Sequence, residues 1–356
     1  MNNEKKRILS YDIIRILAMG AVVMVHCAAT YMEFYPGYAT SYRLAAIIDS
    51  LARLGVQMFI MLSGALMLDE NREMNVRKAL RYAGRIALLL ICWSLLYAIK
   101  TQIIEPYQAG EVFSLRLFLW RLLTGNFHMW FLYMLIGLYL ITPILRLFVK
   151  KENRTAIRYF LVLSLIFHFL CPVINFFFNQ VTSTYDYTKE FLNQFQMGFV
   201  NAYVAYYILG WYLTNFELNA RQRKGLYLLG TVGLLSMILG TILFSTESYK
   251  SYSVFINDMG IFTMLYSVGA FVFLLYFMKA HPVHSEKAKK LTVKLSNLSF
   301  GVYMIHIMVL DVLEAHVFAG KNAACIPLIW AAAVTVSLAL TFVLSKIPGV
   351  RKLVRG

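Results

Sequence analysis

An arginine and a histidine lie eleven positions apart in an apolar stretch near the start of the chain. Arg15 and His26 belong to residues 10–32, SYDIIRILAMGAVVMVHCAATYM, which also holds Asp12. At 100° and 1.5 Å per residue, a helix places the two side chains about 20° apart in direction and about 16 Å apart in height. Ionisable groups at the centre of a membrane span cost roughly 2.5 to 3.5 kcal/mol, so they usually face protein or water. The spacing therefore predicts a polar path along one face of this helix.

The two residue types indicate different chemistry at the two ends of this path. A guanidinium binds phosphate through two parallel hydrogen bonds, whereas a neutral imidazole accepts a proton near pH 7. Asp12, three residues before Arg15, is near enough to pair with it and hold the guanidinium in place. A long ligand with a phosphate at one end and a reactive group at the other, such as acyl-coenzyme A, could contact Arg15 and His26 at the same time. Each residue alone also fits an ordinary role, as a snorkelling arginine or a hydrogen-bonded core histidine.

The composition indicates what kind of molecule holds these residues. Of the 356 residues, 60% are hydrophobic and 15% are charged, and the mean hydropathy is +0.62. Such a chain is typical of an all-α integral membrane protein. Windows of about 20 residues predict a bundle of about ten transmembrane helices. They lie near 8–32, 46–68, 86–104, 128–148, 157–179, 198–216, 225–245, 258–278, 295–318 and 325–345.

Lysine and arginine accumulate in loops that stay in the cytoplasm, and here they predict the orientation. With cytoplasmic N- and C-termini, the inner segments hold about 24 basic residues. The outer segments hold about six, namely Arg43, Arg116, Arg121, Lys189, Lys250 and Lys321. Topology and anionic lipid headgroups then explain the net charge of +16 without nucleic acid. We expect one membrane-embedded domain over residues 1–356, with no appended soluble domain.

Several other signals are missing from the sequence. The four cysteines are scattered singly through apolar runs and form no disulfide or metal pattern. No His/Glu cluster has the spacing of metal ligands, so no metal site is expected. No internal repeat is visible, which disfavours a transporter built from repeated halves.

Four stretches, in order along the whole chain, resemble acyltransferase family 3, integral membrane proteins that modify cell-surface glycans in bacteria. The family's first helix carries an Arg or Lys followed by a His, and Arg15 and His26 match this pattern. The other stretches are FIMLSGALML, FHMWFLYMLIGLYLITPILR and LSFGVYMIHIMVL. The family's ten helices with both termini inside also agree with the topology predicted from the basic residues.

The resemblance implies a function. It implies transfer of an acyl group, usually acetyl, from cytoplasmic acyl-coenzyme A to a hydroxyl of an envelope polysaccharide or lipid-linked glycan at the outer face of the bacterial cytoplasmic membrane. Acyl-coenzyme A is then a co-substrate, and no tightly bound cofactor is expected. The family pattern makes His26 the catalytic residue and Arg15 a contact of the coenzyme's phosphates. His26 would act as a general base, or as a covalent acyl carrier.

Two basic or mixed-charge groups could add to such a site. Asp49, Arg53 and Gln57 fall at i, i+4 and i+8, so they share one helix face, as a structural ion pair or as contacts of substrate or coenzyme. A second group consists of Arg77, Arg81 and Arg85, spaced by four on a cytoplasmic segment. They are expected to bind phosphate, either of lipid or of the coenzyme's nucleotide.

Histidines in two of the family-like stretches are further candidates. His128, followed by Trp130, begins the fourth predicted helix on the outer side, as an interfacial belt or as a contact of the acceptor. His306 lies near mid-membrane in the ninth, with Tyr303 on roughly the same face, lining an acyl tunnel or hydrogen-bonding internally. Three acidic residues toward the outer end could orient His26: Glu33, Asp311 and Glu314.

A different class of protein also fits part of the pattern. A polytopic permease or flippase for an anionic compound would use Arg15 and Arg53 as substrate ligands. The two hypotheses differ in one chemical respect, because only an acyltransferase cleaves the thioester of acyl-coenzyme A.

Overall fold

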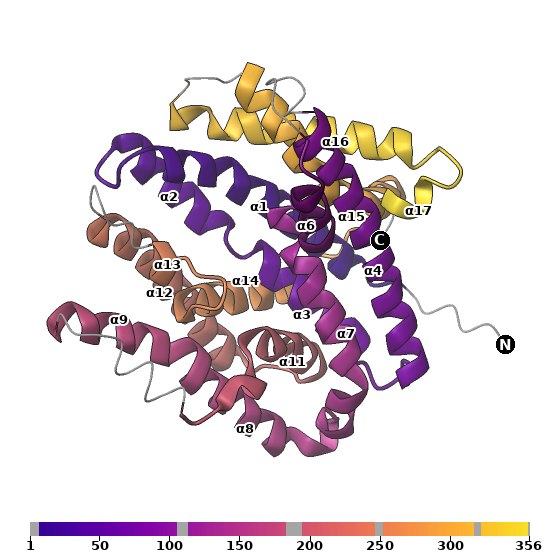
Figure 1. Cartoon of the computed structure of the whole chain (residues 1–356). Coiled ribbons are helices and arrows are strands. Elements are labelled where there is room, and N and C mark those ends of the chain that lie inside the picture. Colours follow the sequence, from indigo (N-terminus) through magenta and orange to yellow (C-terminus); the bar gives the residue numbers. More distant parts are fainter. Residues whose placement is uncertain (1–6, 105–112, 183–193, 246–251, 317–321, 355–356) are drawn as a thin grey trace. The chain divides into compact units, whose positions relative to one another are not determined.

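Helices dominate the residues that the structure describes. A computed structural model describes residues 7–104, 113–182, 194–245, 252–316 and 322–354, and these ranges contain no strand (Figure 1). Within them, nine helical stretches are long and apolar enough to cross a membrane. The all-α class and the multi-pass membrane character expected from the sequence are therefore confirmed. Lys189, Lys250 and Lys321, used for the predicted orientation, lie outside the described residues.

The helices cluster into two compact units. The first consists of Met1–Ala65 with Thr155–Gly356, and the second of Leu66–Arg154. Each unit has its own internal packing and is considered by itself. The expectation of a single membrane-embedded domain stays a prediction.

The first unit holds most of the helices. They are α1 (Leu9–Phe34), α2 (Thr40–Ala52), α3 (Gly55–Met67), α8 (Arg154–Ser164), α9 (Cys171–Thr182), α11 (Ala202–Asn215), α12 (Ala220–Phe244), α13 (Tyr252–Phe255), α14 (Ile261–Ala280), α15 (Glu286–His316), α16 (Ile326–Leu344) and α17 (Arg351–Val354). The ends of α3 and α8 cross the boundary with the second unit by one or two residues.

Helix α1 forms the centre of the first unit. It packs against α2, α15 and α16, and Ile14, Ala18 and Val23 on it are fully buried. The indole Nε1 of Trp330 on α16 donates to the carbonyl of Gly20 at 2.8 Å. Because α1 has neighbours along its length, a polar side chain such as that of Asp12 is buried against protein.

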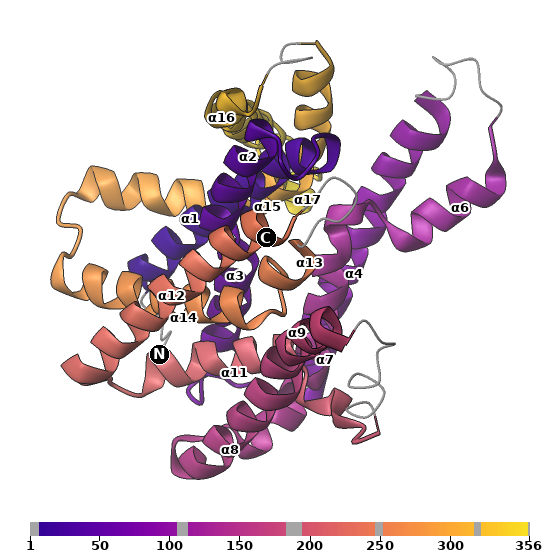
Figure 2. The same cartoon turned by 90° about the vertical axis from the view of Figure 1, so that its left-hand side faces the viewer.

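Helices α1 and α15 run parallel. Asp12 contacts Ser296, the ring of His26 lies beside that of His306, and Thr30 contacts Glu314. The residue numbers rise together on both helices, as they must in a parallel pair. A separate pair, α12 and α14, lies side by side in the same unit (Figure 2).

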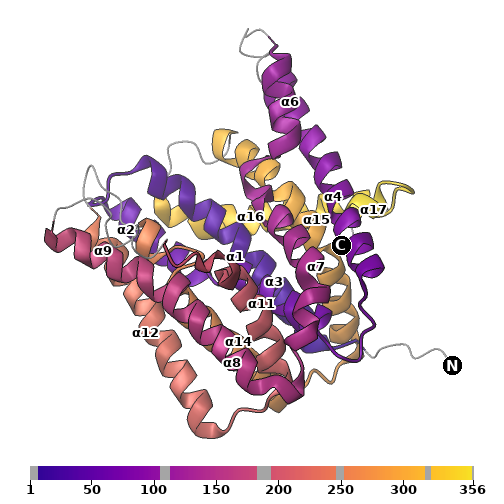
Figure 3. The same cartoon turned by 60° about the horizontal axis from the view of Figure 1, so that its bottom comes forward.

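The second unit is a smaller helix cluster. It contains α4 (Val76–Ile99), the π-helical turn Lys100–Ile104, α6 (Leu115–Thr124) and α7 (Trp130–Phe148). Helix α4 packs against both α6 and α7 (Figure 3). The Asn75 side chain accepts from the Lys78 backbone at 3.0 Å and so caps the start of α4.

One predicted helix differs from the structure in a way that matters for the site. The sequence predicts a single helix over 46–68, whereas the chain forms α2 and α3 with a break at Arg53 and Leu54. Gly55, the first residue of α3, lies so close to α1 that a Cβ there would sit 2.8 Å from the Ala18 carbonyl. The interruption and this close approach occur together, and hydropathy alone reveals neither.

Two glycines allow α3 and α11 to cross with their backbones in contact. A Cβ on Gly64 would lie 1.8 Å from the carbonyl oxygen of Tyr207, and a Cβ on Gly210 would lie 1.9 Å from that of Met61. Small residues at such crossings let membrane helices approach closely. Gly64 belongs to the family-like stretch FIMLSGALML, and the close crossing gives a steric reason for a glycine there.

We predict opposite effects of alanine at two helical glycines. Gly64→Ala should lower stability by about 1 to 3 kcal/mol or more, because backbone atoms must move apart. Gly225→Ala on α12 is the matched control, since nothing lies within 4 Å of its Cβ position. It should stabilise slightly, by about 0.5 to 1 kcal/mol, through the lower helix propensity of glycine. Thermal unfolding of the detergent-purified variants measures both, and an unchanged melting temperature in Gly64→Ala would contradict the close crossing.

Candidate functional site

Arg15 and His26 lie on one uninterrupted helix. Helix α1 runs without a break from Leu9 to Phe34, so the two residues are about 16 Å apart along its axis. Both are partly exposed, whereas Ala18, Met19 and Val22, which lie between them on α1, are buried. The spacing predicted from the sequence is thus built on a single rigid element.

A cluster of polar side chains surrounds the N-terminal end of α1. The Asp12 carboxylate accepts from Arg7 Nε at 2.6 Å, from Arg7 Nη2 at 2.7 Å and from the Ser296 hydroxyl at 2.6 Å. Arg7 Nη2 also donates to Asn297 at 2.9 Å. The hydrogen bonds to Asp12 raise the pKa of the Arg7 guanidinium. These contacts bind the start of α1 to α15.

Arg15 is held more loosely in the same cluster. The expected ion pair with Asp12 is present, but its N–O distance is 3.8 Å, and Nη1 donates to Ser296 at 3.4 Å. Arg7 is therefore the closer partner of Asp12, which the sequence analysis did not foresee because Arg7 precedes the helix. One third of the Arg15 side chain is exposed. An anion can therefore reach this guanidinium.

The ring of His306 lies beside the ring of His26. Their centroids are 5.1 Å apart and the planes are inclined by 40°. His306 is fully buried, and its Nδ1–H donates to the Tyr303 carbonyl at 2.6 Å. In a neutral ring this contact places the lone pair on Nε2. The structure thus brings His26 together with His306 and Tyr303, which lie about 280 residues further along the chain.

The three acidic residues proposed as partners of His26 differ in exposure and in hydrogen bonding. Glu314 accepts from the Thr30 hydroxyl at 3.2 Å, one turn beyond His26 on α1. Glu33 and Asp311 are exposed. The ring of His306 lies beside His26, so it joins these carboxylates as a candidate for orienting that imidazole.

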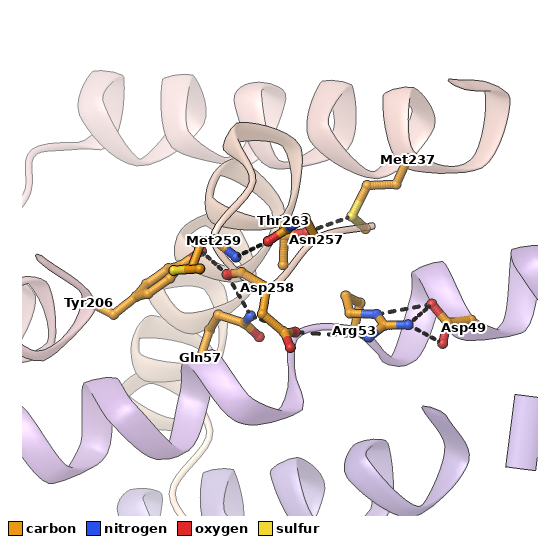
Figure 4. Close-up of polar contacts among 9 residues, drawn as sticks. All are labelled: Asp49, Arg53, Gln57, Tyr206, Met237, Asn257, Asp258, Met259 and Thr263. Atoms are coloured by element: carbon orange, nitrogen blue, oxygen red, sulfur yellow. Dashed lines mark hydrogen bonds and ion pairs between the residues drawn. The ribbon is translucent and has the colours of Figure 1, made fainter. Parts of the chain in front are cut away.

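A second polar cluster lies where α2 meets α3 (Figure 4). Arg53 donates from Nε to Asp49 at 3.0 Å and from Nη2 to both Asp49 oxygens at 2.5 Å. Asp258, just before α14, lies 3.9 Å from Arg53 Nη1. Gln57 donates to the Asp258 side chain at 3.2 Å and to its carbonyl at 3.1 Å. The Asp49–Arg53 pair expected from the i, i+4 spacing is confirmed, whereas Asp258 joins it from a distant part of the chain.

This cluster lies near His26. Gly55 rests against Val22, which precedes His26 by about one helical turn. Arg53 stands two residues before Gly55, at the break between α2 and α3. His26 therefore lies beside an imidazole from α15, and the break packs against α1 about one turn before it.

The remaining candidates lie in the second unit. Arg77, Arg81 and Arg85 follow one exposed face of α4, opposite the buried Ala79 and Ala83. Their four-residue spacing therefore produces the predicted basic surface.

His128 differs from these arginines because it is buried, with 2% exposure. Its Nδ1 donates to the Asn126 side-chain oxygen at 3.1 Å, and its ring meets that of Tyr97 edge-on at 5.2 Å. Trp130 is partly exposed and meets the neighbouring ring of Phe131 edge-on. His128 is thus a well-packed residue, and a contact with an acceptor stays a prediction.

The arrangement on α1 suits acid-base chemistry at one end and anion binding at the other. Among the described residues, no group of three His, Cys, Asp or Glu side chains is placed to hold a metal ion.

Comparison with known families gives one match. A family model described as an acyltransferase domain, that of acyltransferase family 3, matches residues 8–346, which is nearly the whole chain. Searches of curated proteins and of solved structures returned no match.

The different burial of the two rings predicts different reactivity. Diethyl pyrocarbonate modifies accessible neutral imidazoles, so it should label His26 before His306, which is 0% exposed. Peptide mass spectrometry of the protein in lipid nanodiscs measures the order of labelling. The exposed His316 on α15 is the positive control and should react first. Labelling of His306 ahead of His26 would contradict the arrangement.

Proposed function

Since the chain belongs to acyltransferase family 3, we propose that this membrane acyltransferase moves an acyl group from acyl-coenzyme A to a hydroxyl of an envelope polysaccharide or lipid-linked glycan. Acetyl is the acyl group we favour, and the bacterial cytoplasmic membrane is the location. One observation carries the proposal: a single helix presents a reachable guanidinium and, about 16 Å further along, an imidazole flanked by polar groups. That spacing suits a donor with phosphates at one end and a thioester at the other.

The proposed mechanism uses His26 as a general base. As the acceptor hydroxyl attacks the thioester carbonyl carbon, its proton passes to a ring nitrogen of His26. The carbonyl electron pair moves to oxygen, and when the double bond re-forms, the carbon–sulfur bond breaks. The leaving thiolate takes the proton from His26 and departs as coenzyme A thiol. The His306 ring, fixed by its bond to Tyr303, limits the orientations open to His26.

Arg15 has a binding role in this proposal. Its guanidinium would contact the phosphates of the coenzyme through parallel hydrogen bonds. Asp12 and Ser296 lie beside it and restrict its side chain. The donor would thus be anchored at the N-terminal end of α1, with its acyl group delivered toward His26.

We further propose ten crossings with both termini in the cytoplasm. Six of the nine candidate spans lie between α1 and α15, and an even number between them would make these two helices antiparallel. They are parallel by their contacts, which favours a seventh crossing between them. Helix α11 supplies it, because its 14 residues extend about 21 Å and a 3-10 turn, Met197–Val200, precedes it. The excess of basic residues in the inner segments supports the orientation.

The basic face of α4 is a proposed anion-binding surface. Arg77, Arg81 and Arg85 suit the diphosphate of coenzyme A and lipid phosphate equally in chemical terms. His128 and Trp130 stay candidates for contact with the acceptor.

Replacing His26 by alanine tests the acid-base role. His26→Ala should lower the rate of coenzyme A release from acetyl-coenzyme A by about 10² to 10⁴, the usual contribution of such a group. Binding of the coenzyme should change little, because the imidazole acts on the acceptor proton. His316→Ala, on the exposed end of α15, should keep normal turnover. Wild-type protein that never releases the thiol would favour the permease instead.

Two substitutions of Arg15 test the anchor. Arg15→Ala should raise the Michaelis constant for acetyl-coenzyme A more than Arg15→Lys, which keeps the charge but loses the planar fork. The turnover number at saturating donor should change less than the Michaelis constant in both variants. If the Michaelis constant is unchanged in Arg15→Ala, Arg15 does not bind the donor and only extends its charged group toward the membrane surface.

A further inference from the structure

Arg53 is clamped on one side of its guanidinium. Asp49 accepts from Nε and Nη2, and this carboxylate is fully buried. Within the described residues, Nη1 makes no hydrogen bond, since its nearest carboxylate oxygen, on Asp258, is 3.9 Å away. The Arg53 side chain is 18% exposed. The clamp therefore fixes the plane of the guanidinium and directs the Nη1 donors away from Asp49.

The position of Arg53 relative to α1 follows from the close contact at Gly55. A Cβ on Gly55 would lie 2.9 Å from Val22 Cγ2 and 2.8 Å from the Ala18 carbonyl. The break between α2 and α3 is thereby held against α1 about one turn below His26. The backbone that carries Arg53 is therefore fixed beside the helix that carries His26.

We infer that Arg53, through Nη1, donates a hydrogen bond to the carbonyl oxygen of the donor thioester and stabilises the oxyanion that forms there. This inference rests on the proposed acyltransferase function and adds a second catalytic residue to it. Donors fixed in advance toward a developing negative charge act strongly, because no reorganisation is needed at the moment of reaction. Asp49 supplies that fixation from the opposite side of the guanidinium.

The acceptor hydroxyl, His26 and Arg53 each take part in the proposed reaction. The acceptor oxygen forms a bond to the carbonyl carbon, its proton moves to His26, and the carbonyl π pair becomes a lone pair on the oxygen beside Arg53. The oxyanion returns this pair to the carbon, the carbon–sulfur bond breaks, and the thiolate receives the proton from His26. Arg53 stays protonated throughout, as guanidinium groups in proteins do.

Asp258 indicates the side from which an oxygen reaches Nη1. Its carboxylate already points toward this nitrogen, and two hydrogen bonds from Gln57 hold Asp258 in place. Tyr206 adds a third bond, from its hydroxyl to the Asp258 carbonyl at 3.2 Å. The distance of 3.9 Å is longer than a hydrogen bond, so Asp258 does not saturate the donor.

Kinetics of three variants in membrane vesicles test the inference. Arg53→Lys keeps the charge but lacks the planar fork that fixes Nη1 while Nε and Nη2 bond Asp49, so thiol release from acetyl-coenzyme A should slow at least about tenfold. The double variant Asp49→Asn with Arg53→Gln leaves no unpaired partner in the Asp49–Arg53 pair and should slow turnover by about 10² to 10³. Arg158→Gln is the matched control, because it also removes a guanidinium that donates to another side chain, the Tyr212 hydroxyl. This variant should have normal turnover.

Binding of an analogue without the thioester carbonyl separates catalysis from folding. S-ethyl coenzyme A lacks only this carbonyl oxygen, so its dissociation constant should be the same for wild type and for the Arg53 variants. Slow turnover together with normal binding of this thioether supports the inference. Near-normal turnover in the double variant, or loss of thioether binding equal to the loss of turnover, would overturn it. A wild-type protein that releases no thiol overturns the proposed function itself, which is a distinguishable result.

Discussion

A charged side chain buried among apolar helices must find a partner of opposite charge or a set of hydrogen bonds, and this constraint organises the first unit. Asp49 is fully buried and Asp12 nearly so, and each is bound by an arginine. Removing one partner of a buried ion pair typically costs about 3 to 5 kcal/mol, because the other charge is left uncompensated. Around Asp12, further hydrogen bonds from Ser296 to Asp12 and from Arg7 to Asn297 join the start of α1 to α15.

Because α1 and α15 are parallel, they contact each other both near Arg15 and near His26. Near one end, Ser296 and Asp12 join the two helices beside Arg15. Near the other, His306 lies beside His26. A guanidinium and an imidazole on parallel, packed helices keep their separation, and in the proposed mechanism that separation matches a donor bound at one end and reacting at the other.

The sequence predicted the parts of this site that depend on local helical geometry. Helical periodicity sufficed to place Arg15 and His26 on one face and to pair Asp49 with Arg53, because residues three, four and eleven apart have fixed relations on a helix. It could not predict the break after Ala52, which accompanies a backbone contact between Gly55 and α1. Asp258 and His306 reach their partners across long stretches of chain, and a single sequence contains no signal for such contacts.

In the proposed mechanism, a donor bound at Arg15 from the cytoplasmic side extends along α1, and its acyl group reaches an acceptor on the other side of the membrane. Sealed inside-out vesicles test it directly when radiolabelled acetyl-coenzyme A is supplied only to their outer, cytoplasmic face. The account predicts that label accumulates in glycan material inside the vesicles, and that vesicles with His26→Ala protein accumulate none. Labelling that occurs only when the donor is enclosed on the periplasmic side would contradict the proposed direction and the role of Arg15 as the cytoplasmic anchor.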